Sequence, residues 1–301
     1  MRTVVYREFG GPQVLEVVER PVPEPGPGEV RIAMAAAAVS PTDPMTVSGV
    51  AVQAGIAPAP EGQWERGLGW DVAGWVDAVG ADVDLAPGAA VIGMLPAFAV
   101  ASGAQAEYVV LPARDVAPAP AGVSPAQAAT LPLNGLTAAT AVAELGLPAG
   151  ASLLVIGGAG GVGGFAVQLA ALAGLRVVAT AAERDAETVR GYGAEVVSRD
   201  ALPTAVDGVL DTAGTGAAAL APVRDGGVLV TVAGAVEGER GIRSVQALVQ
   251  QDGARLAELS ALAEKGELIL PKAITYPLEE VAAAQERLAA GGVGGRLVLV
   301  T

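Results

Sequence analysis

Most of the structural information in this chain lies in the segment Ser152-Leu-Leu-Val-Ile156-Gly-Gly158-Ala-Gly160-Gly-Val-Gly163-Gly-Phe-Ala-Val-Gln-Leu-Ala-Ala-Leu172. An apolar strand leads into a glycine-rich turn of the form G-x-G-x-x-G, and an apolar helix follows. Glycines let the backbone turn sharply and let a pyrophosphate approach, while the helix N-terminus offers free N–H groups. A ligand-free turn in a glycine-rich chain is the alternative, but the complete strand, turn and helix favour dinucleotide binding.

The choice of dinucleotide depends on the end of the next strand, Val177-Val-Ala-Thr180-Ala-Ala182-Glu-Arg184-Asp. An acidic residue there would hold the ribose of NAD, whereas small residues with a nearby arginine admit a 2′-phosphate. Ala182 and Arg184 therefore favour NADP(H). Glu183 either repels that phosphate or begins the next helix, and Arg199 is a second phosphate candidate or an ordinary surface arginine.

The composition removes several kinds of chemistry. The 301 residues include neither cysteine nor histidine, which excludes thiol nucleophiles, Ser-His-Asp catalysis and metal sites built on Cys or His. The 32 acidic residues outnumber 18 Lys and Arg, giving a net charge of −14, so nucleic acid and anionic membranes are disfavoured as partners. We expect no metal site.

The organisation along the chain predicts two different architectures. Residues 1–115 contain short strand candidates separated by Pro and Gly clusters, whereas helices and strands alternate beyond the proline-rich Pro112–Pro125 boundary. That alternation predicts a doubly wound parallel sheet. Residues 43–66 are expected to be a long irregular loop, and Trp70 and Trp75 are expected in the core.

A charge-free run from Leu145 to Leu175 is long enough for a membrane span. Its glycines and Pro148 instead predict a buried strand, turn and helix. No signal peptide is visible at the start. We therefore expect a cytoplasmic protein.

Further motifs follow one another in a recognisable order: Val39-Ser-Pro-Thr-Asp43, Gly69-Trp-Asp-Val-Ala-Gly74, Val79-Gly80, Ala106-Glu-Tyr-Val109, Leu131-Pro-Leu-Asn-Gly-Leu-Thr-Ala138, Asp211-Thr212, Val232-Ala-Gly234 and Gly295-Arg-Leu-Val-Leu299. Together with the glycine turn, they make the whole chain resemble the zinc-independent medium-chain dehydrogenases/reductases, in the NADPH:quinone oxidoreductase (zeta-crystallin-like) branch and its enoyl reductase relatives. The absence of Cys and His supports the zinc-free branch independently.

The resemblance implies an α/β fold with two parts. A β-rich GroES-like catalytic domain would contain residues 1–118 and 272–301, and a Rossmann domain that binds NADP(H) would contain residues 119–271. It also implies a homodimer joined through the last Rossmann strand, near Arg243–Val249.

The resemblance and the motifs also imply site residues. Ser40, Thr42 and Asp43 are the expected catalytic residues, where Ser40 replaces a frequent asparagine and Asp43 is equally well a turn former. Asn134, Asp211 and Thr212 have capping as an alternative role. The expected cofactor-binding residues are Asn134, Thr137, Gly158, Ala159, Gly160, Gly161, Val162, Gly163, Thr180, Ala182, Arg184, Arg199, Asp211, Thr212, Val232, Ala233, Gly234 and Arg296.

Without a metal or histidine, the cofactor must supply the difficult step. The expected activity is hydride transfer to a quinone or an α,β-unsaturated carbonyl, with the protein positioning the acceptor and polarising its oxygen. Two alternatives stay open. One is a biosynthetic tailoring enzyme that reduces or cyclises a specialised intermediate, and the other is a cofactor-binding protein without turnover.

Overall fold

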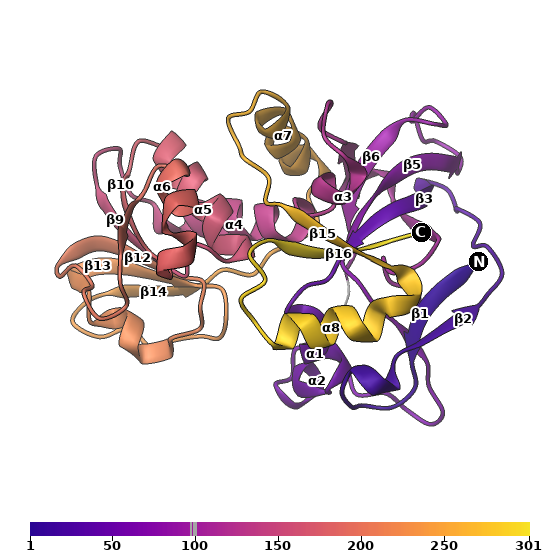
Figure 1. Ribbon diagram of the computed structural model, residues 1–301, viewed down its shortest axis with the longest axis horizontal. Helices are drawn as coiled ribbons and strands as arrows, with labels where there is room; N and C mark the ends of the chain where they lie inside the picture. The colour runs from indigo at the N-terminus through magenta and orange to yellow at the C-terminus, as the bar shows by residue number, and fades with distance from the viewer. Residues whose placement is uncertain (97, 99–100) are drawn as a thin grey trace. The chain divides into compact units, whose positions relative to one another are not determined.

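The computed structural model describes residues 1–96, 98 and 101–301, which form two compact units (Figure 1). The first unit contains Met1–Leu133, Gln251–Lys265 and Leu270–Thr301, and the second contains Asn134–Gln250 and Gly266–Ile269. Residues 119–133 and 251–265, which the resemblance assigns to the nucleotide-binding domain, thus group with the first unit.

The second unit is built on a six-stranded parallel sheet with the strand order β11-β10-β9-β12-β13-β14. Numbered along the chain from β9, this order is 3-2-1-4-5-6, which is that of the doubly wound dinucleotide-binding fold. The prediction of that fold is confirmed. The strands are β9 (Ser152–Ile156), β10 (Arg176–Thr180), β11 (Glu195–Val197), β12 (Val206–Asp211), β13 (Val223–Thr231) and β14 (Arg243–Gln246).

Helices connect these strands. The central strands of the sheet are almost wholly apolar. Leu153 to Ile156 of β9 are buried, as expected for a parallel strand covered on both faces. Among the described residues, no helix is both long and apolar enough to cross a membrane. The helical segments here are α4 (Pro132–Leu145), which begins in the first unit, α5 (Gly161–Leu172), η3 (Glu183–Asp185), α6 (Ala186–Gly191) and η4 (Gly216–Leu220).

The first unit contains a seven-stranded and a three-stranded sheet. β3 alternates buried and partly exposed positions, because one face of the strand packs on the core. The larger sheet consists of β3 (Glu29–Ala38), β5 (Asp71–Val79), β6 (Ala90–Met94), β7 (Tyr108–Pro112), β8 (Val116–Pro118), β15 (Ala273–Pro277) and β16 (Arg296–Val300). The smaller one consists of β1 (Arg2–Tyr6), β2 (Glu16–Glu19) and β4 (Arg66–Gly67).

Helices of the first unit attach remote segments to these sheets. Ser260 on α7 donates a 2.7 Å hydrogen bond to the Pro118 carbonyl at the end of β8, which fixes residues 251–265 to this unit. The helical segments are η1 (Pro12–Val14), α1 (Thr42–Val47), α2 (Val50–Gln53), η2 (Ala113–Asp115), α3 (Pro125–Ala128), α7 (Gly253–Glu264), η5 (Leu278–Glu280) and α8 (Val281–Ala289).

Two local expectations are wrong. Residues 43–66 are not wholly irregular, since α1 and α2 form there and are separated by Gly49 at φ 80°. A side chain on Gly49 would also touch the Phe9 ring at 2.9 Å. Trp75 is 46% exposed, because its position in β5 points away from the core, whereas Trp70 is buried as expected.

Candidate functional site

The glycine turn joins β9 to α5 and is held from the neighbouring strand. The Gly157 N–H donates to Thr180 Oγ1 at 2.9 Å, and the Gly158 N–H donates to the Thr180 carbonyl at 2.9 Å. Gly160 is the N-cap of α5, and no side chain of the described residues caps this helix. The first backbone N–H groups of α5 are therefore not taken by a capping side chain, which suits an anion.

The glycines of the motif are needed for different local reasons. A Cβ on Gly163 would lie 2.1 Å from the Gly157 carbonyl oxygen, and one on Gly158 would lie 2.8 Å from Ala179 Cβ. These two glycines allow α5 and the turn to pack against the sheet. A Cβ on Gly160 would meet only the Gly157 oxygen, at 3.2 Å, so its other side is open to a ligand.

A cavity of about 650 Å³ lies beside this turn, at the carboxyl ends of β9 and β10. Three arginines line it: Arg184 from η3, Arg190 from α6 and Arg199 after β11. Arg184 is 67% exposed and lies 3.5 Å from Asp185. Within the part of the chain that the structure describes, Arg190 and Arg199 lie in no ion pair.

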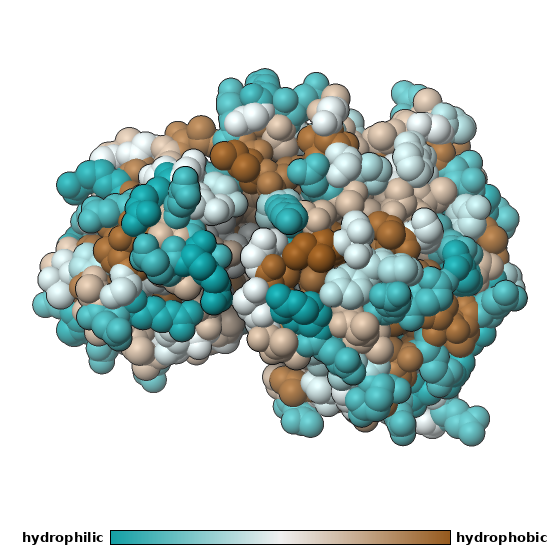
Figure 2. Space-filling model, in the orientation of Figure 1, coloured by the Kyte–Doolittle hydropathy of each residue, from teal (hydrophilic) through white to brown (hydrophobic). Residues whose placement is uncertain are grey.

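Carboxylates share this cavity. Glu183 and Asp185 line it beside the arginines, so three positive charges face two negative ones. Hydrophilic side chains are prominent over α6 and its surroundings in the space-filling view (Figure 2). The cavity thus presents exposed arginines that an anionic ligand can reach, with a small positive excess.

Other predicted residues at this sheet edge serve the protein backbone. Asp211 accepts hydrogen bonds from the N–H groups of Ala213 and Thr215, at 2.9 and 2.6 Å, and from the Thr215 hydroxyl at 2.9 Å. Thr212 lines the cavity while its hydroxyl donates to the Ile156 carbonyl at 2.8 Å. Both carboxylate oxygens of Asp211 thus accept hydrogen bonds from the protein itself, as its alternative capping role predicts.

The remaining predicted cofactor residues of this unit lie on two elements. Asn134 and Thr137 are buried on α4. Val232, Ala233 and Gly234 follow β13, and the Gly234 carbonyl accepts a 2.6 Å hydrogen bond from the Thr231 hydroxyl. The structure therefore brings together around the cavity Gly157, Ala159, Gly160, Thr180, Ala182, Arg184, Arg199 and Thr212.

In the first unit, Ser40 lies between β3 and α1, and Thr42 and Asp43 begin α1. Asp43 is fully buried, and its Oδ2 accepts hydrogen bonds from the Ser40 N–H at 2.9 Å and from Gln105 Nε2 at 3.1 Å. The Thr42 hydroxyl is buried and, among the described residues, has no hydrogen-bond partner. Asp43 thus fixes the backbone at Ser40.

Two further charged side chains belong to this buried cluster. Asp71, at the start of β5, is fully buried and accepts a 2.5 Å hydrogen bond from the Leu133 N–H. Arg296, at the start of β16, is 7% exposed and donates to the Val39 carbonyl at 3.4 Å. Arg296, a predicted cofactor-binding residue, lies in the first unit near these carboxyls, and its role toward the cofactor stays a prediction.

Burial dominates the electrostatics of this cluster. It raises the pKa of Asp43 to about 7, against the hydrogen bond from Ser40 and the charge of Arg296. It likewise raises the pKa of Asp71 to about 7, against the bond from Leu133 and the same charge. Burial lowers the pKa of Arg296, whereas both carboxylates favour its charged form. Each acid is therefore poised to exchange a proton near neutral pH.

Two family models match this chain. The alcohol dehydrogenase GroES-like domain matches residues 26–121, and a model described as zinc-binding dehydrogenase matches residues 184–299. An NADPH-dependent alkenal/one oxidoreductase of Arabidopsis thaliana chloroplasts is 33% identical over 99% of this chain and 79% of its own length. The chain belongs to the medium-chain dehydrogenases/reductases, in the quinone oxidoreductase branch.

Solved structures of this family are similar over the whole chain. The quinone oxidoreductase from Coxiella burnetii has a TM-score of 0.87 and 30% identity, covering 100% of this chain and 99% of its own. A structure described as an NAD-dependent alcohol dehydrogenase has a TM-score of 0.87 and 31% identity, with full coverage of both chains. The zinc in one family model's name has no Cys or His ligands available here, because the chain contains neither residue.

Three residues escaped the sequence analysis. Arg190 lies on the helix that follows the discriminating loop and lines the cavity. Asp71 stood inside a quoted motif without a role, and Gln105 directly precedes another. Their proximity to Asp43 comes from strand pairing and from a contact between segments 62 residues apart.

Proposed function

We propose that this medium-chain dehydrogenase/reductase is an NADPH-dependent reductase of quinones or α,β-unsaturated carbonyls. The observation that carries the proposal is the cavity in which Arg184, Arg190 and Arg199 lie beside the glycine turn. The names of its relatives support both acceptor classes, since one acts on alkenals and enones and another on quinones.

The residues of the second unit fit this cofactor. Gly158 to Gly163 and the N-terminus of α5 would hold the pyrophosphate, because the turn leaves room there and its glycines exclude side chains. Arg184, Arg190 and Arg199 would hold the 2′-phosphate, which a guanidinium binds through charge-assisted hydrogen bonds. Asn134, Thr137, Val232, Ala233 and Gly234 stay as proposed contacts along the rest of the cofactor. When bound, NADPH supplies the hydride.

The first unit would position the acceptor. Ser40 and Thr42 carry the hydroxyl groups of the proposed catalytic segment, which can donate to a carbonyl or quinone oxygen and stabilise the negative charge that develops there. Asp43 is a positioning residue, since its carboxylate holds the Ser40 N–H and is itself fully buried. Arg296 and Asp71 would keep this turn in place through the buried charge cluster.

The experiment is NADPH oxidation at 340 nm, with NADH in parallel, against one quinone and one enone. We expect turnover with both acceptor types and a preference for NADPH. Replacing Arg184, Arg190 and Arg199 together by alanine should lower kcat/KM for NADPH by about 10- to 100-fold, as expected for lost bonds to a charged group, and should leave kcat/KM for NADH nearly unchanged.

The matched control is Arg176→Ala, which removes an exposed arginine from the opposite end of β10. It should leave both cofactors unaffected. Equal losses with NADPH and NADH in the triple variant would contradict the 2′-phosphate assignment. NADPH binding without turnover on any quinone or enone would contradict the proposed activity and favour a specialised biosynthetic substrate or a role without turnover.

We also propose a homodimer that pairs β14 with its copy. β14 is an edge strand of the six-stranded sheet, and Leu248 just beyond it is 69% exposed. Light scattering should give a dimer mass, and Leu248→Arg should lower it toward the monomer, whereas Leu172→Arg, at another exposed leucine, should not. A cytoplasmic location and domain boundaries at 118/119 and 271/272 stay predictions from the sequence.

A further inference from the structure

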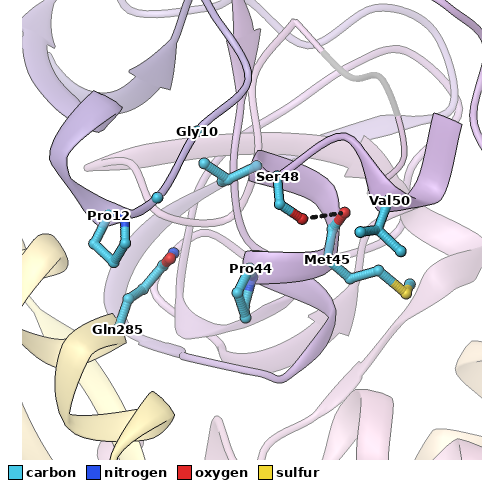
Figure 3. Close-up of a pocket in the computed structure, with 9 residues that line it drawn as sticks. Gly10, Pro12, Pro44, Met45, Ser48, Val50 and Gln285 are labelled. Carbon is cyan, nitrogen blue, oxygen red and sulfur yellow. Dashed lines mark hydrogen bonds between the residues drawn. The ribbon is translucent and has the colours of Figure 1, made fainter. Parts of the chain in front are cut away.

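A second cavity, of about 330 Å³, lies within the first unit. Its walls come from three places in the sequence: the segment Gly10–Pro12, the helices α1 and α2, and α8. Figure 3 shows the lining residues as sticks, among them the apolar Pro12, Pro44, Met45 and Val50. None of the described residues that line this cavity is charged.

One buried polar side chain lies among the apolar walls of this cavity. Gln285, on α8, is 2% exposed, and neither its Nε2 nor its Oε1 has a hydrogen-bond partner among the described residues. Figure 3 shows its amide extending from α8 between Pro12 and Pro44. A buried amide without partners destabilises the folded protein, and a leucine would fill similar space without that cost.

Several of the neighbouring groups either have no N–H or already form a hydrogen bond elsewhere. Pro12 and Pro44 have no N–H group, and the Pro12 carbonyl already accepts from the Leu15 N–H at 3.2 Å. The Gly10 N–H donates to the Val47 carbonyl at 3.0 Å. The Ser48 hydroxyl donates to the Met45 carbonyl at 3.4 Å. The Gln285 Oε1 can therefore accept a hydrogen bond from a molecule in the cavity, and its Nε2 can donate one to it.

We propose that this cavity is a binding site for a small, uncharged and mostly apolar molecule that carries an amide or lactam edge. A carboxamide presents a C=O and an N–H side by side, and a lactam presents the complementary N–H and C=O in one plane, so the two can form a pair of hydrogen bonds. The apolar walls suit a hydrocarbon ring, and the absence of lining charges disfavours an ion. Its wall includes Pro44 and Met45, which follow the proposed catalytic Asp43 on α1, but the proposed binding itself involves no hydride transfer.

The test uses methyl NMR of the full chain labelled with ¹³C-methyl methionine. Four methionines give four signals. Met45 lines the cavity, whereas Met34 and Met94 are buried in the core at 3% and 1% exposure and serve as internal controls. The probes are ε-caprolactam and cycloheptanone, which have the same ring size and a carbonyl, but only the lactam has an N–H.

We expect the lactam to shift the Met45 signal saturably and to bind about fivefold more tightly than the ketone, the value of one extra neutral hydrogen bond. In Gln285→Leu the lactam should lose this preference, and the thermal midpoint should not fall. No Met45 shift, or equal affinities in the wild-type protein, would overturn the proposal without any variant. Because NADPH is absent, neither result depends on the proposed reductase activity.

Discussion

Arg184 of the second unit and Arg296 of the first have opposite environments. Arg184 is 67% exposed beside the cavity of the second unit, and its nearest carboxylate is its sequence neighbour Asp185 at 3.5 Å. Arg296 is 7% exposed in the first unit, with Asp43 and Asp71 buried near it. An exposed guanidinium can exchange bound water for a ligand phosphate at low cost. A buried guanidinium instead stabilises the fold, because removing it leaves the buried carboxylates without a compensating charge.

The largest expected effect tests the glycine turn, which lies beside the cavity of the exposed arginines. Gly163→Ala puts a Cβ where the Gly157 oxygen lies 2.1 Å away, so α5 must shift from the sheet. We expect NADPH affinity to fall about 100-fold, as for a displacement of about 1 Å at a binding site. Fluorescence titration with NADPH measures it. Gly191→Ala on α6 is the matched control, because a Cβ there meets nothing within 4 Å.

An effect of similar size is expected from removing the buried arginine. Arg296→Met should lower the free energy of unfolding by about 3 kcal/mol at pH 8, because Asp43 and Asp71 lose the one cation that opposes their burial. Urea titration measures this change. Arg255→Met, an exposed arginine paired with Glu258, should change it by less than about 1 kcal/mol.

Unchanged stability in Arg296→Met would contradict the contrast between the two regions. It would mean that both carboxyls stay protonated in the folded chain and need no cation. An NADPH affinity unchanged in the same variant, after correction for stability, would agree with the placement of Arg296 outside the phosphate cavity.

The smallest effect concerns pH. The pKa of Asp71 is raised to about 7 in the folded chain from an ordinary value near 3.8. Between these values, the folded chain binds a proton that the unfolded chain has released. Stability from this group is therefore full below pH 4 and falls as the pH rises through 7, by at most about 1.4 kcal/mol per pH unit.

Asp71→Asn should flatten this dependence, because an amide can still accept from the Leu133 N–H but cannot titrate. Urea titrations between pH 5 and pH 8 measure the slope. Asp84→Asn, which removes an exposed carboxylate, controls for the loss of one negative charge. Identical slopes in the wild type and Asp71→Asn would show that Asp71 does not titrate in this window.

Local rules predicted the second unit well. The glycine turn, the apolar β9 and the alternation beyond it were sufficient for a parallel sheet, because each of these features is set by residues close in sequence. The prediction that Trp75 lies in the core was wrong, because a large apolar residue does not reveal which face of its strand is exposed.

The sequence by itself determined the doubly wound sheet, the phosphate turn and the exclusion of cysteine and histidine chemistry, because these depend on residue type and on short-range spacing. Only the tertiary structure brought Asp71, Gln105 and Arg296 to Asp43, added Arg190 to the arginine cavity, and left the Gln285 amide unpartnered among prolines. Such contacts join residues tens to hundreds of positions apart. Their energies come from burial and desolvation, which a single sequence does not specify.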